Sequence, residues 1–260
     1  MPIITLISDW GTKDYYLSAV KGHILKLLPE ATIVDISHEV PPFDIQSASY
    51  ILGHAYSHFP EGTIHIVGIN TTASMKAPHV IVKFNNHYFV GADNGIFPLI
   101  MGKKHPEKII EIDILQDSYY FTFSERDVFC KVAVHIAKGN DLEEIGSEIN
   151  TLQILEQINP IIEKDRIGGC IDYIDKCSNV ITNISENDFK IQTKGRKFEI
   201  VISPRYVITK ISQSYMDVPQ YGLVALFNST GKLEIAQNNG NIAAILNLNI
   251  GDPINIYITD

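Results

Sequence analysis

The sequence is poor in cysteine and in long apolar runs, and each shortage excludes a class of protein. Its 260 residues include only 3 cysteines (Cys130, Cys170 and Cys177), too few and too scattered for a disulfide framework or a zinc site. We therefore expect reduced thiols in a cytoplasmic protein. No stretch approaches the roughly 20 apolar residues of a membrane-spanning helix. The N-terminus reaches Asp9 without a basic segment, so we expect neither a secretory signal nor a membrane partner.

Positive charge and familiar nucleotide motifs are also scarce. Lys plus Arg number 21 against 30 Asp plus Glu, which gives a net charge of −9. Because a nucleic-acid binder needs a basic face, we expect no nucleic-acid partner. The glycine patterns of dinucleotide and phosphate loops are missing, as is the serine elbow of esterases, and the histidines lack metal-site spacing. We expect a small polar or cationic ligand and no metal.

Apolar patterns alternate between strand and helix in the first part of the chain, which predicts an α/β architecture with a mostly parallel sheet and flanking helices. Asp44 is the expected N-cap of the second helix, and Asn85–Asn86 is the expected turn of a hairpin. The predicted strands are 4–10, 31–37, 62–69, 79–84 and 87–92, and the predicted helices are 15–28, 43–56 and 126–138.

The pattern changes after about residue 150. From Gly169 onward, short alternating runs are separated by turn residues, and the runs 189–193 and 243–248 are among those expected to be strands. This pattern predicts a smaller, all-β barrel. We therefore predict two domains, 1–164 and 165–260.

Acidic and amide side chains follow the predicted parallel strands of the first domain. Asp9 and Asp14 flank the first strand-to-helix turn, and Asn70 ends the third strand. Ligands of open α/β sheets bind beyond the carboxyl ends of the strands, so these residues are candidates for one crevice that binds a small polar ligand. The alternative is that each residue only caps a helix or a turn.

Several strings carry a resemblance to a known family. They are LISDWGTKDYYLSAVKG, IVDISHEVPPFDIQSASYIL, GADNGIF, FTFSERDVFC, YIDKCSNVITNI and NSTGKLEIAQNNGNIAA. Together they resemble the S-adenosylmethionine (SAM) hydroxide adenosyltransferases, the SAM hydrolases related to the fluorinase and chlorinase, over nearly the whole chain. The resemblance implies a homotrimer whose pocket lies between one subunit's first domain and its neighbour's second. It implies no cofactor, because SAM is itself the substrate or ligand.

The resemblance also implies binding roles for residues in both domains. In the first domain, Asp14 matches a ribose-diol aspartate, and Phe43 occupies the aromatic position that flanks the sugar. The matched residues of the second domain hold the methionine end, contact its carboxylate, stack on adenine or read the adenine edge. In chain order they are Asp175, Asn179, Tyr215, Ser229 and Asn238.

The catalytic positions of the family are not kept. In the hydrolases an Asp and an Arg from V-D-P-G-V-G-T-x-R-R work with a His from T-F-H-G-R-D to hold the attacking water. The aligned residues here are Asn70, Ala77 and Ser124, which make poor acid/base groups. Glu125 is adjacent and could serve as a base, or it is simply an exposed glutamate before a helix.

Two other interpretations follow from these departures. The hydroxyls of Thr71, Thr72 and Ser74 could cradle a halide, although a charged Glu125 would repel one. We expect an enzyme that cleaves SAM slowly to adenosine and methionine, with Asn70, Ser124 and Glu125 around the nucleophile. The alternative is a catalytically inactive homotrimer that binds SAM or adenosine.

Overall fold

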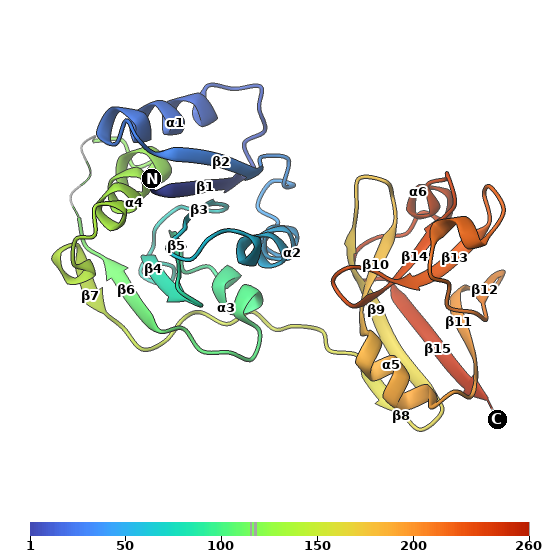
Figure 1. The fold of residues 1–260 in the computed structure, drawn as a ribbon. Coiled ribbons are helices and arrows are strands. Elements are labelled where there is room, and N and C mark those ends of the chain that lie inside the picture. The colour runs from blue at the N-terminus through green and yellow to red at the C-terminus, as the bar shows by residue number, and fades with distance from the viewer. Residues whose placement is uncertain (115, 117–118, 260) are drawn as a thin grey trace. The chain divides into compact units, whose positions relative to one another are not determined.

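The computed structural model describes residues 1–114, 116 and 119–259, and the chain divides into two compact units, Met1–Glu156 and Gln157–Asp260 (Figure 1). The division falls before β8 (Ile161–Glu163), which the predicted boundary at residue 164 assigns to the first domain. This strand pairs with β9 (Arg166–Ile174), so it belongs to the second unit.

The first unit is built on a seven-stranded sheet in the order β2-β1-β3-β5-β4-β6-β7. β1 lies parallel to β2 and β3, and β3 is parallel to β5, whereas the pairs made by β4 and β6 are antiparallel. The strands are β1 (Ile3–Ser8), β2 (Thr32–Ser37), β3 (Ile64–Gly68), β4 (His79–Phe84), β5 (His87–Ala92), β6 (Lys108–Ile112) and β7 (Gly146–Glu148). The predicted α/β architecture is confirmed, with antiparallel strands on one side of the sheet.

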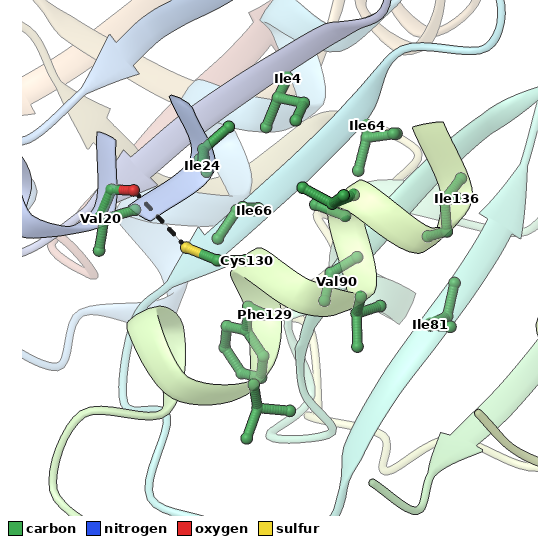
Figure 2. Close-up of a cluster of buried hydrophobic side chains, with 14 of the residues drawn as sticks. Ile4, Val20, Ile24, Ile64, Ile66, Ile81, Val90, Phe129, Cys130 and Ile136 are labelled. Carbon is green, nitrogen blue, oxygen red and sulfur yellow. Dashed lines mark hydrogen bonds between the residues drawn. The ribbon is translucent and has the colours of Figure 1, made fainter. Parts of the chain in front are cut away.

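Helices cover both faces of this sheet because its strands alternate their apolar side chains between two cores. Along β3, Ile64 and Ile66 join a core with α1 and α4, whereas Val67 joins a second core with α2 and α3. Figure 2 shows the first of these cores, in which the Cys130 thiol lies 3.6 Å from the Val20 carbonyl oxygen. The helices are α1 (Tyr16–Leu27), α2 (Ile45–Ala55), α3 (Ile96–Met101) and α4 (Cys130–Ala137), with short 3₁₀ turns η1 (Tyr56–His58) and η3 (Leu142–Glu144).

Local sequence signals account for several boundaries. The Asp44 carboxylate accepts a hydrogen bond from the Ser47 backbone N–H and so caps α2 as predicted. Asn85 and Asn86 have φ values of 49° and 59°, the left-handed pair that a two-residue hairpin between β4 and β5 requires. The helix predicted over 126–138 is divided, because it begins as a π-helical turn, η2 (Glu125–Phe129), before α4.

The second unit is an antiparallel, nearly closed barrel around one apolar core. Its path is β12-β11-β15-β9-β10-β14-β13, and a bridge from Ile211 to Ala225 links the segment after β12 to β13. The elements after β9 are β10 (Val180–Ser185), α5 (Glu186–Thr193), β11 (Lys197–Ser203), β12 (Tyr206–Ile208), η4 (Tyr215–Asp217), β13 (Leu223–Phe227), β14 (Lys232–Gln237), α6 (Ile242–Leu246) and β15 (Pro253–Thr259).

Two runs predicted to be strands in this unit are helical. Residues 189–193 lie in α5, where the Ser185 hydroxyl caps the helix and Phe189 and Thr193 bury the same side one turn apart. Residues 243–248 overlap α6, which is followed by a C-cap residue, Asn247, in a left-handed conformation. Both helices are short, so their helical period is easily mistaken for strand alternation.

None of the helices in the described part of the chain combines the length and apolar character needed to cross a bilayer.

Candidate functional site

The carboxyl ends of strands β1 and β3 bring the first group of candidate residues together. Ser8 is paired with Gly68 at the carboxyl end of these parallel strands, so the segments that follow start side by side. A Cβ on Gly68 would lie 2.6 Å from the Trp10 ring, so glycine is needed there for the indole to lie against β3. Asp9 and Asn70 consequently reach the same edge of the sheet, as the sequence predicts.

A cavity of about 290 Å³ opens at this edge. Six residues proposed from the sequence line it, namely Asp9, Phe43, Asn70, Thr71, Thr72 and Glu125. The other lining residues are Trp10, Tyr16, Pro42, Gly68, Thr122 and Phe123. The cavity therefore combines two carboxylates, an amide and hydroxyls with several aromatic rings.

Aromatic rings form one wall of the cavity. Trp10 and Tyr16 meet the Phe123 ring edge-on, at centroid distances of 6.0 and 5.3 Å. The Arg126 guanidinium lies 5.0 Å from the centroid of Phe123, and Asp127 binds this guanidinium through both carboxylate oxygens. The wall is thus largely preformed and suits a flat or cationic ligand.

Phe43 enters the cavity from a strained backbone. Its φ is 64°, a left-handed conformation that costs a residue other than glycine about 1 kcal/mol. The Phe43 N–H donates to Asp9 Oδ2 at 2.8 Å, and the Phe43 carbonyl accepts from the Ile45 N–H at 3.1 Å. These bonds hold the turn while the Phe43 side chain remains 73% exposed, which is a sign of a role in binding.

Glu125 is the buried acid of the cavity. It is only 4% exposed, so the interpretation as an exposed glutamate before a helix is wrong. The Thr71 hydroxyl donates to Glu125 Oε1 at 2.5 Å, and the Thr71 carbonyl accepts from His79 Nε2 at 2.8 Å. Burial raises the pKa of Glu125, the negative charge of Asp9 raises it further, and the Thr71 hydrogen bond opposes the shift.

The loop that carries Asn70 is held from beneath. Asn70 has a φ of 46°, and its carbonyl oxygen accepts from Asn94 Nδ2 at 3.3 Å. The same nitrogen lies 2.9 Å from the Ile69 carbonyl oxygen, and Asn94 itself is buried. The exposed side chain of Asn70 therefore stands on a fixed backbone at the cavity.

Four sequence-predicted positions of the first unit do not line the cavity, namely Asp14, Ser74, Ala77 and Ser124. Ser124 is buried immediately before η2, between the lining residues Phe123 and Glu125. Ala77 belongs to a turn in which its N–H bonds the Ser74 hydroxyl at 3.0 Å. Asp14 lies exposed in the turn before α1.

The second unit holds its candidate residues in two polar groups. The Asp175 carboxylate accepts from the Asn179 backbone N–H at 2.8 Å and from Asn179 Nδ2 at 3.0 Å. The Tyr215 hydroxyl donates to Glu234 Oε1 at 2.6 Å, and Asn228 Nδ2 donates to the other oxygen at 3.1 Å. Burial, the Glu234 bond and the Asp175 charge raise the pKa of Tyr215, which keeps its hydroxyl a donor.

The remaining two candidates of this unit differ in surroundings. Asn238 is buried, and its Nδ2 donates to the Val218 carbonyl at 2.9 Å, which uses one of its two N–H donors. Ser229 is exposed in the turn between β13 and β14.

Sequence reasoning missed several of these residues. Trp10, Tyr16 and Phe123 converge only in the folded structure, although all three lie in strings that carry the family resemblance. Glu234 was also missed, and its signal is a charged residue in the middle of the apolar strand β14. Over residues 1–114, 116 and 119–259, no group of three or more His, Cys, Asp or Glu side chains could hold a metal ion.

Comparison with protein families gives two matches in chain order. Residues 4–146 match the SAM hydroxide adenosyltransferase N-terminal domain, and residues 169–255 match the C-terminal domain of the same family. The resemblance seen in the sequence is confirmed.

Individual relatives match over nearly their whole length. A protein of Methanocaldococcus jannaschii named (R)-S-adenosyl-L-methionine hydrolase is 30% identical, over 98% of this chain and 96% of its own. A Nocardia brasiliensis protein named fluorinase is 24% identical, over 99% of this chain and 97% of its own. A crystal structure of an uncharacterized conserved protein from Thermotoga maritima matches with a TM-score of 0.89 and 30% identity, over 98% of this chain and 99% of that one.

Proposed function

This chain belongs to the SAM hydroxide adenosyltransferase family, and on that premise we propose that it binds SAM and cleaves it slowly to adenosine and methionine. The reaction is a nucleophilic attack at ribose C5′. The sulfonium is already an activated leaving group, because it departs as a neutral thioether. The protein's task is therefore to position the nucleophile opposite sulfur and to exclude water around it.

The observation that carries the proposal is the cavity at the carboxyl ends of β1 and β3. It combines the carboxylates of Asp9 and Glu125 with aromatic rings, and among its described lining residues none is Lys or Arg. Such a lining is complementary to a ligand with a positive centre, because carboxylates and the faces of aromatic rings both attract cations. SAM combines a sulfonium with a flat base and a sugar.

We assign the sugar to the first unit. Asp14 is the proposed ribose-diol ligand on the basis of its family motif, and Phe43 flanks the sugar. Asp9 lines the cavity and also orders the Phe43 turn through its hydrogen bond. In this proposal Asn70 and Glu125, which line the cavity, surround the nucleophile together with Ser124, which is assigned on the basis of its family motif alone.

We assign the rest of SAM to the second unit of a neighbouring copy in a homotrimer. Asp175, Asn179 and Ser229 hold the methionine end, Tyr215 stacks on adenine, and the segment around Asn238 reads the adenine edge. The bonds within the Asp175–Asn179 pair support this assignment, because they preorganise its polar atoms. Sedimentation of the purified protein at the mass of a monomer would refute the trimer.

The expected rate is low because Asn70, Ala77 and Ser124 occupy the family's acid/base positions. Loss of a positioned acid/base group costs about 10²- to 10⁴-fold in rate. All three cysteines are free thiols, which suits a reducing cytoplasm, and we place the activity there.

A second candidate function is SAM or adenosine binding without turnover. The loss of the three catalytic groups at Asn70, Ala77 and Ser124 favours it, because a pocket that lacks those groups can still hold the ligand. Both functions need the cavity, and they differ only in whether a product forms.

The test is to incubate the full-length protein with SAM and to follow adenosine and methionine by chromatography, with calorimetry on the same sample. Adenosine at a rate above the protein-free control supports the enzyme. Heat of binding without adenosine supports the binding protein. If neither heat nor product appears with SAM or adenosine, both proposals are wrong.

A further inference from the structure

The proposed cleavage to adenosine uses water as the nucleophile, whereas relatives of this chain are named fluorinase as well as hydrolase, so the site must distinguish water from halide. Water and halide make different demands on a site. Water has a proton to lose and needs an acceptor, whereas a halide is an anion and needs donors without a nearby negative charge.

Glu125 lies where its carboxylate can contact a nucleophile bound in the cavity. It lines the same cavity as Asp9 and Asn70, and it stands at the first residue of η2, a kind of helical turn often found at functional sites. The Thr71 hydroxyl holds one of its carboxylate oxygens at 2.5 Å, and His79 fixes Thr71 through the backbone. The Glu125 carboxylate is therefore oriented by Thr71, which lines the cavity, and indirectly by His79, which does not.

The charge at this place opposes an anion. Asp9 and Glu125 are both acidic, and the Arg126 guanidinium beside Phe123 is already paired with both carboxylate oxygens of Asp127. One carboxylate about 4 Å from a halide lowers its occupancy by roughly 1,000-fold at an effective dielectric of about 20. The sulfonium of bound SAM favours the ionised form of Glu125, because opposite charges stabilise each other.

Glu125 is also the best proton acceptor at the cavity. Of the described lining residues, only Asp9 and Glu125 carry a carboxylate that can accept a proton. Each has one oxygen in a hydrogen bond, Asp9 Oδ2 with the Phe43 N–H and Glu125 Oε1 with the Thr71 hydroxyl, so burial is what distinguishes them. His79 does not line the cavity, and its Nε2 carries a proton because it faces a carbonyl oxygen. Burial raises the pKa of Glu125 and makes it a stronger base than an exposed carboxylate.

We propose that Glu125 is the catalytic base of this site and that it selects water, a neutral nucleophile with a proton, over halide ions. This inference rests on the proposed SAM cleavage. The water oxygen forms a bond to C5′, the C5′–S bond breaks with its electron pair going to sulfur, and the water proton passes to Glu125. Adenosine and neutral methionine leave, and Glu125 returns the proton to solvent.

The experiment compares wild type with Glu125→Gln, Glu125→Asp and Glu30→Gln in single turnovers with saturating SAM. Glu125→Gln keeps an oxygen for Thr71 but removes the charge and the base. Glu30→Gln is the matched control, because it removes one negative charge from an exposed turn after α1. Each reaction is run without halide and with rising sodium chloride or sodium fluoride, and adenosine and 5′-halo-5′-deoxyadenosine are quantified.

We expect wild type and Glu30→Gln to form adenosine alone at every halide concentration. Glu125→Gln should release adenosine at least about 100-fold more slowly, with a much smaller change in the dissociation constant of SAM. Glu125→Asp should release adenosine at least about tenfold faster than Glu125→Gln. The reason is that aspartate keeps a carboxylate base, although its shorter side chain holds the base farther from the nucleophile.

Three results separate the possible failures. Adenosine release by Glu125→Gln within threefold of wild type would overturn the base, and halo product from wild type would overturn the selection of water, each leaving SAM cleavage intact. Absence of any product from wild type would overturn the proposed function and this inference with it. Thermal unfolding of each variant shows whether a lost rate is only lost folding.

Discussion

The two ends of the parallel strands in the first unit both bury ionisable side chains, but in opposite ways. At the carboxyl end, Glu125 lines a cavity. Toward the other end of β3, His65 is fully buried; its Nδ1 lies 2.7 Å from the Thr5 hydroxyl, and its Nε2 lies 3.1 Å from His87 Nδ1. The Tyr56 and Phe89 rings pack on this histidine.

Burial shifts both groups toward their neutral forms, yet only one has a place for a ligand. Burial raises the pKa of Glu125 and lowers the pKa of His65 to about 3, with the His87 charge acting in the same direction on His65. The partners of His65 are all internal, so its network is structural. A shifted pKa therefore indicates a functional group here only where a cavity reaches it.

The largest expected effect comes from restoring the family's catalytic groups at the cavity end. The triple variant Asn70→Asp, Ala77→Arg, Ser124→His should raise adenosine release by about 10²- to 10⁴-fold, because it supplies a positioned acid/base system. Initial rates of adenosine formation at saturating SAM measure this. An unchanged rate in a folded triple variant would mean that the cavity does not hold SAM in a position where these groups can act on it.

The histidine end should control stability in acid. The folded pKa of His65 lies below its unfolded value, so its contribution to stability is complete above about pH 6.5 and is lost as the pH falls toward 3. We expect a loss of roughly 3 kcal/mol at pH 4 relative to pH 7 from this group. Urea unfolding of wild type and His65→Gln at both pH values measures it, and equal pH dependence of the two proteins would contradict the assignment.

The same linkage has the opposite sign at the cavity end. The folded pKa of Glu125 lies above its unfolded value, so its ionisation costs stability as the pH rises through the normal carboxyl range. Glu125→Gln should therefore be more stable than wild type at pH 7, and closer to it at pH 4. Urea unfolding curves decide this, and a less stable variant at pH 7 would show that Glu125 serves the fold.

The smallest expected change in stability concerns Phe43. Phe43→Gly relieves a left-handed φ but adds freedom to the unfolded chain, and these effects of about 1 kcal/mol each nearly cancel. The affinity for SAM should nevertheless fall about tenfold, because the variant removes an aromatic contact. Calorimetric titration with SAM measures the affinity, and an unchanged value would separate Phe43 from the ligand.

Local patterns predicted most elements of the first unit and failed at specific places in the second. The hairpin at Asn85–Asn86 and the cap at Asp44 follow from side-chain chemistry confined to a few residues. Helix α5 was missed although Ser185 and Asp188 form a clear cap, because its apolar residues are few and its length is only 8 residues. Short helices inside a barrel depend on the core that covers them.

The sequence alone determined the family, the α/β and barrel architecture, and the convergence of Asp9 and Asn70, because strand ends in a parallel sheet meet at one edge. It could not determine that Glu125 is buried and bound to Thr71, or that Trp10, Tyr16 and Phe123 form one wall. Those facts depend on which way a π-helical turn, the first turn of α1 and the segments around Trp10 and Phe123 direct their side chains. Only the packing of distant segments sets these directions, and with them the charge and the accessibility of the site.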